Sequence, residues 1–316
     1  MKYISTRNKN LNLDASSAIL QGLSKDKGLF ILENPSDLQV NLEDCLNMNY
    51  QELAYKILSK YLNDFTSEQI HTCISNAYTH TFSSKDITPT VKVKDDYILE
   101  LFHGPTSAFK DVALQILPHL LTTSLKIQGS KEEIIILTAT SGDTGKAALE
   151  GFRDVDGTKI CVFYPERGVS EIQKLQMITQ EGNNVNVAAV SGNFDDAQNG
   201  VKKIFTDEGY KALLGNNNFK LSSANSINWG RLVPQIVYYF SAYADMLSGD
   251  EITNGEKINI VVPTGNFGNI LAAYYAKKMG LPVNKFICAS NKNNVLTDFI
   301  KTGVYNKNRD FHTTIS

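Results

Sequence analysis

Hydrophobic residues recur every three to four positions through Tyr50–Leu62 and Glu68–Phe82, a spacing that predicts amphipathic helices. Residues 1–95 are therefore expected to be mainly helical. From residue 133 onward the pattern changes to short apolar runs, each followed by a turn and a helical pattern. Strands are expected at 133–140, 159–164, 184–190, 257–263 and 285–289. Apolar strands that alternate with helices are typical of parallel sheets covered on both faces, so the sequence predicts an α/β fold.

Two glycine-rich turns, one at 138–146 and one at 263–269, each join an expected strand to an expected helix. Glycine lets the backbone turn sharply and approach a ligand closely, and the first N–H groups of a helix can hold an anion such as phosphate. Ligands in such folds gather at the carboxyl ends of strands, so both turns are expected to face a shared cleft. The alternative for each turn is that its glycines serve geometry alone.

The spacing of these turns argues against two common nucleotide-binding classes. The turn at 263–269 does not match the GxGxxG pattern of dinucleotide-binding proteins. In the other turn only two residues separate Gly142 from Gly145, and Ala147 follows Lys146, whereas a P-loop needs four residues and then Ser or Thr. A nicotinamide enzyme and a P-loop nucleotidase are therefore disfavoured.

Lys110 follows a turn-forming segment and stands at the start of an apolar helix expected at about 109–125, just after a short strand expected at 97–102. Desolvation and a helix N-terminus both disfavour the ammonium form, which makes a neutral, nucleophilic amine more accessible. Such an amine can form a Schiff base with an aldehyde cofactor. Taken alone, Lys110 is better explained as a surface lysine whose stem packs on apolar surface.

The composition excludes several other classes. The chain has 316 residues, of which 42% are hydrophobic and 20% charged, and a net charge of −2 without long runs of one sign. This distribution gives no basic surface for nucleic acid. The four cysteines are far apart and the five histidines lack metal-hydrolase spacing, so no metal site is expected. The N-terminus lacks a signal-peptide core and no apolar run could span a membrane, so a reduced, cytoplasmic protein is expected.

Four segments together resemble the signatures of the threonine synthase family, a resemblance that runs in order along the chain to about residue 290. They are Leu-Phe-His-Gly-Pro-Thr-Ser-Ala-Phe-Lys-Asp (101–111), Thr-Ala-Thr-Ser-Gly-Asp-Thr-Gly (138–145), Ser-Ser-Ala-Asn-Ser-Ile-Asn (222–228) and Pro-Thr-Gly-Asn-Phe-Gly-Asn (263–269). Thr6-Arg7, Gln21-Gly22-Leu23 and Gly28-Leu29-Phe30 are also similar. Any one segment is a weak signal, whereas the four together are specific.

The resemblance implies a pyridoxal-phosphate enzyme of the tryptophan synthase β-like fold, also called fold type II. Its expected layout is a helical N-terminal region at 1–95, a large cofactor-binding domain at 96–132 and 216–316, and a small α/β domain at 133–215. Lys110 would carry pyridoxal 5′-phosphate as a Schiff base. By similarity the cofactor phosphate is bound by Gly265, Asn266, Phe267, Gly268 and Asn269, and the cofactor ring lies beside Ser141, Asp143 and Thr144. Candidate ligands of the substrate are Lys146, Asn225, Asn228 and Arg231.

The implied reaction converts O-phospho-L-homoserine and water into L-threonine and phosphate. Asn225 and Arg231 can equally be structural. The alternatives are another enzyme of the same fold, such as a threonine or serine dehydratase or a β-replacement enzyme, and a non-catalytic fragment that binds pyridoxal phosphate. Members of the family are longer, so this chain is expected to lack their C-terminal part. The sequence identifies no residue that contacts the pyridine nitrogen, and it leaves open whether the protein is a monomer or a homodimer.

Overall fold

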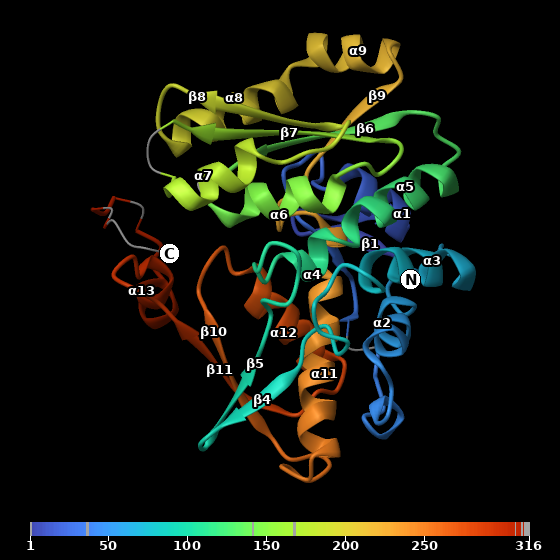
Figure 1. Ribbon diagram of the computed structural model, residues 1–316, viewed down its shortest axis with the longest axis vertical. Helices are drawn as coiled ribbons and strands as arrows, with labels where there is room; N and C mark the ends of the chain where they lie inside the picture. The colour runs from blue at the N-terminus through green and yellow to red at the C-terminus, as the bar shows by residue number, and fades with distance from the viewer. Residues whose placement is uncertain are drawn as a thin grey trace.

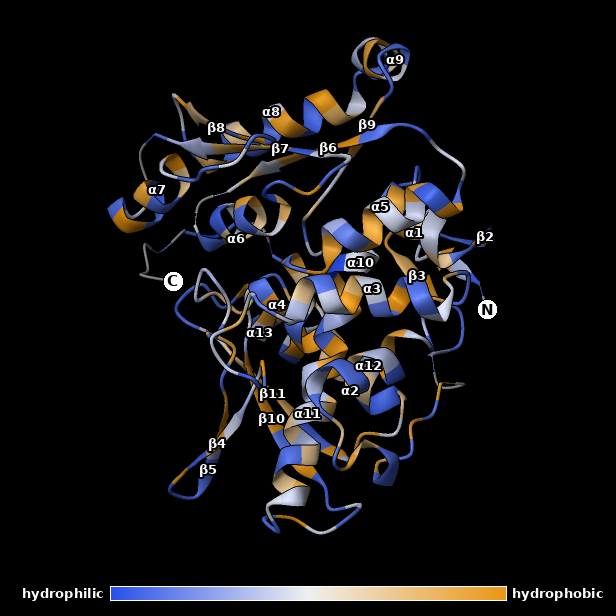
Figure 2. Cartoon of the chain, turned by 45° about the vertical axis from the view of Figure 1, so that its right-hand side comes forward, coloured by the Kyte–Doolittle hydropathy of each residue, from blue (hydrophilic) through white to orange (hydrophobic). Residues whose placement is uncertain are grey.

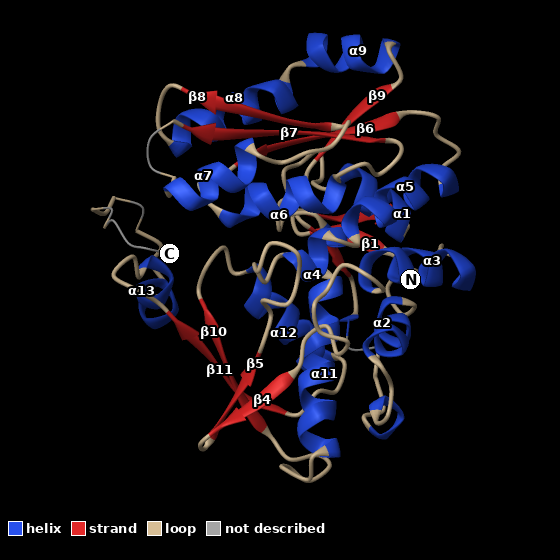
Figure 3. Cartoon of the chain, viewed as in Figure 1, coloured by secondary structure: helices blue, strands red, loops and turns tan. Residues whose placement is uncertain are grey.

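A four-stranded parallel sheet forms one end of the molecule (Figure 1). The structure, a computed structural model, describes residues 2–35, 38–140, 142–166, 169–306, 308–310 and 312. The strand order is β8 (Val185–Val190), β7 (Thr158–Pro165), β6 (Glu133–Ala139) and β9 (Phe219–Ser222). Helices α6 (Asp143–Phe152) and α7 (Glu171–Ile178) lie on one face, and α8 (Phe194–Thr206) lies on the other (Figure 3). This covered parallel sheet confirms the predicted fold class.

Strand β9 extends this sheet beyond the boundary expected at residue 215. Its residues pair in parallel with the first half of β6, with Phe219 opposite Glu133 and Ser222 opposite Ile136. Helix α9 (Glu208–Asn216) precedes β9 and packs against it. Its Asn-rich end, 215–218, leads back into the sheet, and the short, polar-flanked β9 has too weak a pattern to be recognised from sequence.

The other end of the molecule is built around one buried helix, α11 (Pro234–Ser248). Ten of its fifteen residues are buried, which is typical of a helix enclosed on all sides. Around it lie α12 (Gly268–Lys278) and the parallel pair β10 (Ile258–Pro263) and β11 (Val283–Ala289), followed in the chain by α13 (Val295–Thr302). An antiparallel hairpin, β4 (Thr90–Val93) and β5 (Asp96–Leu99), packs beside α11.

The N-terminal region contains the expected helices together with a small sheet that the hydrophobic pattern did not indicate. Its elements are β1 (Tyr3–Ser5), β2 (Asn8–Leu13), α1 (Ala15–Gln21), β3 (Phe30–Leu32), the 3-10 helix η2 (Glu43–Cys45), α2 (Tyr50–Leu58) and α3 (Ser67–Tyr78). The three strands pair antiparallel in the order β2-β1-β3. Strands β1 and β3 have three residues each, too short to show a two-residue period, and the six-residue β2 begins with three polar residues, which explains why the sheet was missed.

The apolar helix expected at about 109–125 is two helices, α4 (Asp111–Leu114) and α5 (Leu117–Ile127). Pro118 lies in the first turn of α5, where its missing N–H and fixed backbone angle favour a helix start over continuation. Helix α4 and the short α10 (Trp229–Leu232) lie between the two ends of the molecule, and α4 contacts both α6 and α11. In Figure 2 hydrophilic and hydrophobic residues both occur along the helices that cover the four-stranded sheet. No helix in the described ranges is long and apolar enough to cross a membrane.

Candidate active site

Lys110 is the N-cap residue of α4, which confirms its predicted place at a helix start. The loop before it is held by Asp111, a fully buried carboxylate that accepts hydrogen bonds from the Thr106 N–H (2.8 Å) and hydroxyl (2.6 Å). Gly104 lies so close to Asp111 that any side chain there would clash with it. The contacts of Asp111 with Thr106 and Gly104 therefore fix the backbone that carries Lys110.

The Lys110 amine forms an ion pair with Asp143, the first residue of α6. The Lys110 side chain is 19% exposed and that of Asp143 44% exposed. Burial lowers the pKa of Lys110, and Asp143 opposes this shift by stabilising the ammonium. The two residues come from different parts of the fold, α4 and the four-stranded sheet unit, so the pair brings together two of the sequence-predicted site residues.

Arg231, buried in α10, interacts electrostatically with both residues of this pair and has two guanidinium nitrogens without partners among the described residues. The residue is 3% exposed, and its Nε and Nη1 atoms have no hydrogen-bond partner among the described residues. Burial lowers the pKa of Arg231 to about 10, an effect that the carboxylates of Asp111 and Asp143 oppose. Its charge in turn lowers the pKa of Lys110. A buried cation with free donors next to a shielded amine is suited to hold an anionic group of a ligand.

The turn at 138–146 is stabilised from within by Thr140. Its hydroxyl accepts hydrogen bonds from the Gly142 N–H (3.2 Å) and the Gly145 N–H (3.1 Å). A Cβ on Gly145 would lie 2.9 Å from Met177 Sδ and 2.9 Å from Val162 Cγ1, so this glycine serves close packing. Thr144 follows Asp143 in the first turn of α6 and is partly buried. Ser141, predicted to lie beside the cofactor, is outside the described residues.

The turn at 263–269 contains two residues with a positive φ, and the Phe267 N–H within it donates to the Thr264 carbonyl oxygen (2.9 Å). Gly265 adopts a φ of +44°, and nothing lies within 4 Å of a Cβ placed on it. Phe267, the N-cap of α12, is in the left-handed region with a φ of +65°, a conformation that costs a residue with a side chain free energy and is often found at functional sites. The helix then begins at Gly268, with Asn269 in its first turn. The backbone geometry is that of an anion-binding helix start.

The segment 222–228 lies against this turn, as the closeness of Ser226 to Gly268 shows. A Cβ on Gly268 would be 3.1 Å from Ser226 Cβ. Asn225 is partly buried in the same segment. Asn228 is fully buried, and its amide donates to the carbonyl oxygens of Ile19 and Ser223 (both 3.0 Å) and accepts from the Gly230 N–H (2.9 Å). The Asn228 side chain therefore joins segments of the protein to one another.

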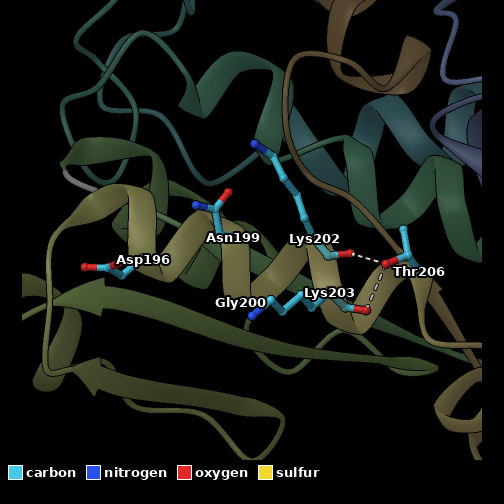
Figure 4. A pocket seen from close by; sticks show the side chains of 6 residues that line it. All are labelled: Asp196, Asn199, Gly200, Lys202, Lys203 and Thr206. Carbon is cyan, nitrogen blue, oxygen red and sulfur yellow. Dashed lines mark hydrogen bonds between the residues drawn. The ribbon is translucent and has the colours of Figure 1, made fainter.

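Lys146 is also engaged within the protein. Its amine hydrogen-bonds to Gln180 and forms an ion pair with Glu150 at 3.4 Å. A shallow surface pocket along α8 is likewise separate from the residues described above (Figure 4). It is lined by Asp196, Asn199, Gly200, Lys202, Lys203 and Thr206, and the Thr206 hydroxyl bonds back to the carbonyl oxygens of Lys202 and Lys203.

Several residues of the site were not found by sequence analysis. Thr140 organises the first turn, and Tyr239 donates a hydrogen bond to the Asn269 carbonyl oxygen (3.2 Å) at the second. Tyr239 lies in a continuous apolar helix, where periodicity predicts a core residue, so no signal marked it. Phe267 itself was among the residues that the resemblance implied, but its left-handed conformation carries no signal in the sequence, because the flanking glycines account for the turn by themselves.

These residues fit a pyridoxal-phosphate cofactor. Lys110 supplies a shielded amine for its aldehyde, the Gly265 turn supplies N–H donors for its phosphate, and the orphan donors of Arg231 are available to a further anion. No group of His, Cys, Asp and Glu within the described ranges is placed to hold a metal ion. The family model described as pyridoxal-phosphate dependent enzyme matches residues 77–316, and the one described as threonine synthase N terminus matches residues 2–78. The fold and the site thus define a pyridoxal-phosphate-dependent enzyme, with pyridoxal 5′-phosphate as its cofactor.

Comparison with known proteins identifies one family within this class of enzymes. The chain is 43% identical over 301 residues to threonine synthase-like 1 of Homo sapiens, an alignment that covers 92% of this chain and 40% of that protein. The crystal structure of pyridoxal-phosphate-bound threonine synthase from Brucella melitensis matches with a TM-score of 0.89 and 38% identity, covering 99% of this chain and 65% of that one. For the threonine synthase of Escherichia coli the TM-score is 0.80 and the identity 34%, with 97% of this chain and 68% of that one covered.

The chain therefore belongs to the threonine synthase family. It spans about two fifths of the length of threonine synthase-like 1 and about two thirds of the two crystallised enzymes.

Proposed function

We propose that this chain carries the cofactor and substrate sites of a threonine synthase that converts O-phospho-L-homoserine and water into L-threonine and phosphate. The observation that carries the proposal is the cluster of Lys110, Asp143 and Arg231, in which a shielded amine lies beside a buried arginine with unsatisfied donors. The substrate has two anionic groups, and the chain offers Arg231 in addition to the cofactor-phosphate turn. The family relationship supports the choice of substrate.

In this proposal each residue has a defined task. Lys110 holds the cofactor, and the backbone N–H groups of residues 265, 266, 268 and 269 hold its phosphate, since the Phe267 N–H donates to Thr264. Asp143 and Thr144 face the cofactor ring, Arg231 binds an anionic group of the substrate, and Asn225 lies in the segment beside it. Bound pyridoxal phosphate would supply the electron sink that makes the substrate's carbon-bound protons removable.

Lys110 is the group suited to move these protons, because burial favours its neutral form. Over the whole reaction the Cγ–O bond to phosphate breaks, Cβ loses one proton, and Cγ gains one to become a methyl group. The hydroxyl of water bonds to Cβ, and the remaining proton of that water leaves with the phosphate. The amine takes a proton from Cα and returns one there at the end. Arg231 stays charged and keeps the substrate's anionic group in place. Lys146 and Asn228 support the surrounding structure through the contacts described above.

The first test of this proposal traps the cofactor. Borohydride reduction of the purified chain with pyridoxal phosphate is expected to give one stable adduct, which peptide mapping places on Lys110. Lys110→Ala should give none. An adduct at another lysine, or an equal amount in Lys110→Ala, would show that the assignment is wrong.

The second test identifies the reaction. Phosphate and threonine are expected in equal amounts from O-phospho-L-homoserine, and ammonia is not expected from L-threonine or L-serine. Ammonia release would instead identify a dehydratase. Trapping of the cofactor without turnover of any of the three substrates would identify a binding protein.

A further inference from the structure

Tyr239 of α11 connects the buried core to the cofactor-phosphate turn. It is 4% exposed, and its hydroxyl donates to the Asn269 backbone oxygen at 3.2 Å and also contacts the side-chain oxygen Oδ1 of the same residue. Asn269 is the second residue of α12, so this contact lies in the first turn of the helix whose N-terminus forms the anion site.

The contact determines how the Asn269 amide is oriented. The oxygen and the NH₂ group of an amide lie on opposite sides of its carbon, so fixing Oδ1 at the Tyr239 hydroxyl turns the NH₂ group away from it. Among the described residues, that NH₂ group donates no hydrogen bond, and the side-chain hydrogen bonds at Asn269 are those with Tyr239. It is therefore available as a side-chain donor beside the N–H groups of the turn, where an anion would bind.

Tyr239 itself is held firmly and remains a donor. Its ring packs against that of Tyr238, with the ring centres 4.8 Å apart. The Tyr238 hydroxyl donates to Gln235 Oε1 (3.1 Å), and Gln235 Nε2 donates to the backbone oxygen of Arg231 (2.9 Å). Burial raises the pKa of Tyr239, so its proton stays in place at neutral pH. One continuous set of buried contacts thus joins Arg231 to the first turn of α12.

We propose that Tyr239 is a positioning residue for the cofactor phosphate: it fixes the Asn269 amide so that the amide NH₂ group donates a hydrogen bond to that phosphate. The inference rests on the proposed function, which places the cofactor phosphate at residues 265–269. It adds a residue outside the turn that determines how strongly the turn binds.

The test compares pyridoxal phosphate with pyridoxal, which lacks the phosphate. Tyr239→Phe is expected to weaken binding of pyridoxal phosphate about tenfold while changing pyridoxal binding less than about twofold, because a hydrogen bond to a charged group contributes more than one to a neutral group. Tyr243→Phe is the matched control. It also removes a buried hydroxyl from α11, one that bonds the Glu256 carbonyl oxygen (3.1 Å) and the Gly255 N–H (3.1 Å) away from the turn, so the ratio of the two affinities should not change.

A second variant separates positioning from general support of the fold. Asn269→Ala should lose the same preference for pyridoxal phosphate, and adding Tyr239→Phe to it should have no further effect, because Tyr239 acts through Asn269. Independent losses in the double variant, or equal losses for both ligands in Tyr239→Phe, would overturn the inference. If Tyr239→Phe does not fold, an unchanged preference in Asn269→Ala overturns it alone.

Binding measurements on the wild-type protein distinguish a failure of the Tyr239 inference from a failure of the proposed function. If wild type binds pyridoxal phosphate no better than pyridoxal, the phosphate site at residues 265–269 is wrong and the inference is overturned with it. If wild type prefers pyridoxal phosphate and Tyr239→Phe keeps that preference in full, only the role of Tyr239 is rejected.

Discussion

Gly151 of α6 lies against the backbone of α4, and replacing it with alanine should reduce the stability of the protein and disturb the cofactor site. A Cβ on Gly151 would lie 2.8 Å from the carbonyl carbon of Leu114 and closer still to its oxygen. Both are backbone atoms of α4 and cannot rotate away, so the helices must separate by about 1 Å to reach normal contact distance. Asp143 begins α6 and Lys110 caps α4, so this movement acts directly on their ion pair.

Two opposing effects determine how much Gly151→Ala changes the free energy of unfolding. Alanine favours a helix over glycine by about 1 kcal/mol, whereas overpacking a well-packed interior costs about 1–3 kcal/mol. Since the clash is with rigid backbone, the upper part of that range applies, and a net loss of about 1–2 kcal/mol is expected. A displacement of about 1 Å at a catalytic group can also reduce the rate by about a hundredfold.

Gly200 provides the matched control because it lies within α8 with nothing within 4 Å of an added Cβ (Figure 4). Gly200→Ala should therefore stabilise the protein by about 0.5–1 kcal/mol through helix propensity alone. Urea unfolding can be followed by the fluorescence of Trp229, the single tryptophan, which is buried in α10. If Gly151→Ala is as stable as Gly200→Ala and binds pyridoxal phosphate like wild type, the close approach of α4 and α6 does not constrain the site.

Three further predictions concern titration and helix capping. Burial lowers the pKa of His119 from 6.5 to about 4, so between these pH values the unfolded chain binds a proton that the folded protein does not. The free energy of unfolding therefore falls as the pH decreases through that window, by up to about 3 kcal/mol. Urea unfolding at pH 7 and pH 5 should show this fall in wild type and not in His119→Gln, and equal falls in the two proteins would contradict the prediction. Asp143→Asn removes a carboxylate that raises the pKa of Lys110, so the pH midpoint for adduct formation with pyridoxal phosphate should move down. A midpoint that moves up would show that the ion pair does not raise the pKa of Lys110. Asn49→Ala removes the capping box that Asn49 forms with Glu52 at the start of α2 and should cost about 1 kcal/mol in urea unfolding, with no effect on adduct formation.

The sequence was informative wherever a local pattern determines local structure. The short apolar runs become parallel strands, and Lys110 lies at a helix start with a lowered pKa, because alternation, glycine placement and burial act over a few residues. The contact between Lys110 and Asp143 could not be found in this way, since 33 residues separate them and their meeting depends on how α4 packs on α6. The same holds for Tyr239 and Asn269, 30 residues apart on neighbouring helices.

Two residues predicted as substrate ligands show how the same residue type can serve either purpose. Lys146 and Arg231 are both cations that follow segments resembling the family's signatures, and only their surroundings in the fold distinguish them. Lys146 forms an ion pair with Glu150 of its own helix and a hydrogen bond with Gln180, which lies just after α7. Arg231 is buried, and its Nε and Nη1 have no hydrogen-bond partner in the part of the chain that the structure describes.

A buried arginine without partners for two of its donors is costly, because desolvation of a charge is compensated only when hydrogen bonds replace those of water. Asp111 and Asp143 supply part of the compensating charge without bonding to Arg231 Nε or Nη1. Replacing the residue with an apolar one of similar volume would remove that cost, and no described residue supplies the missing hydrogen bonds, so the arginine needs a further explanation. Its position beside Lys110 gives that explanation: an anionic ligand bound next to the amine would satisfy the remaining donors, and the free energy stored in the unsatisfied arginine would then favour binding.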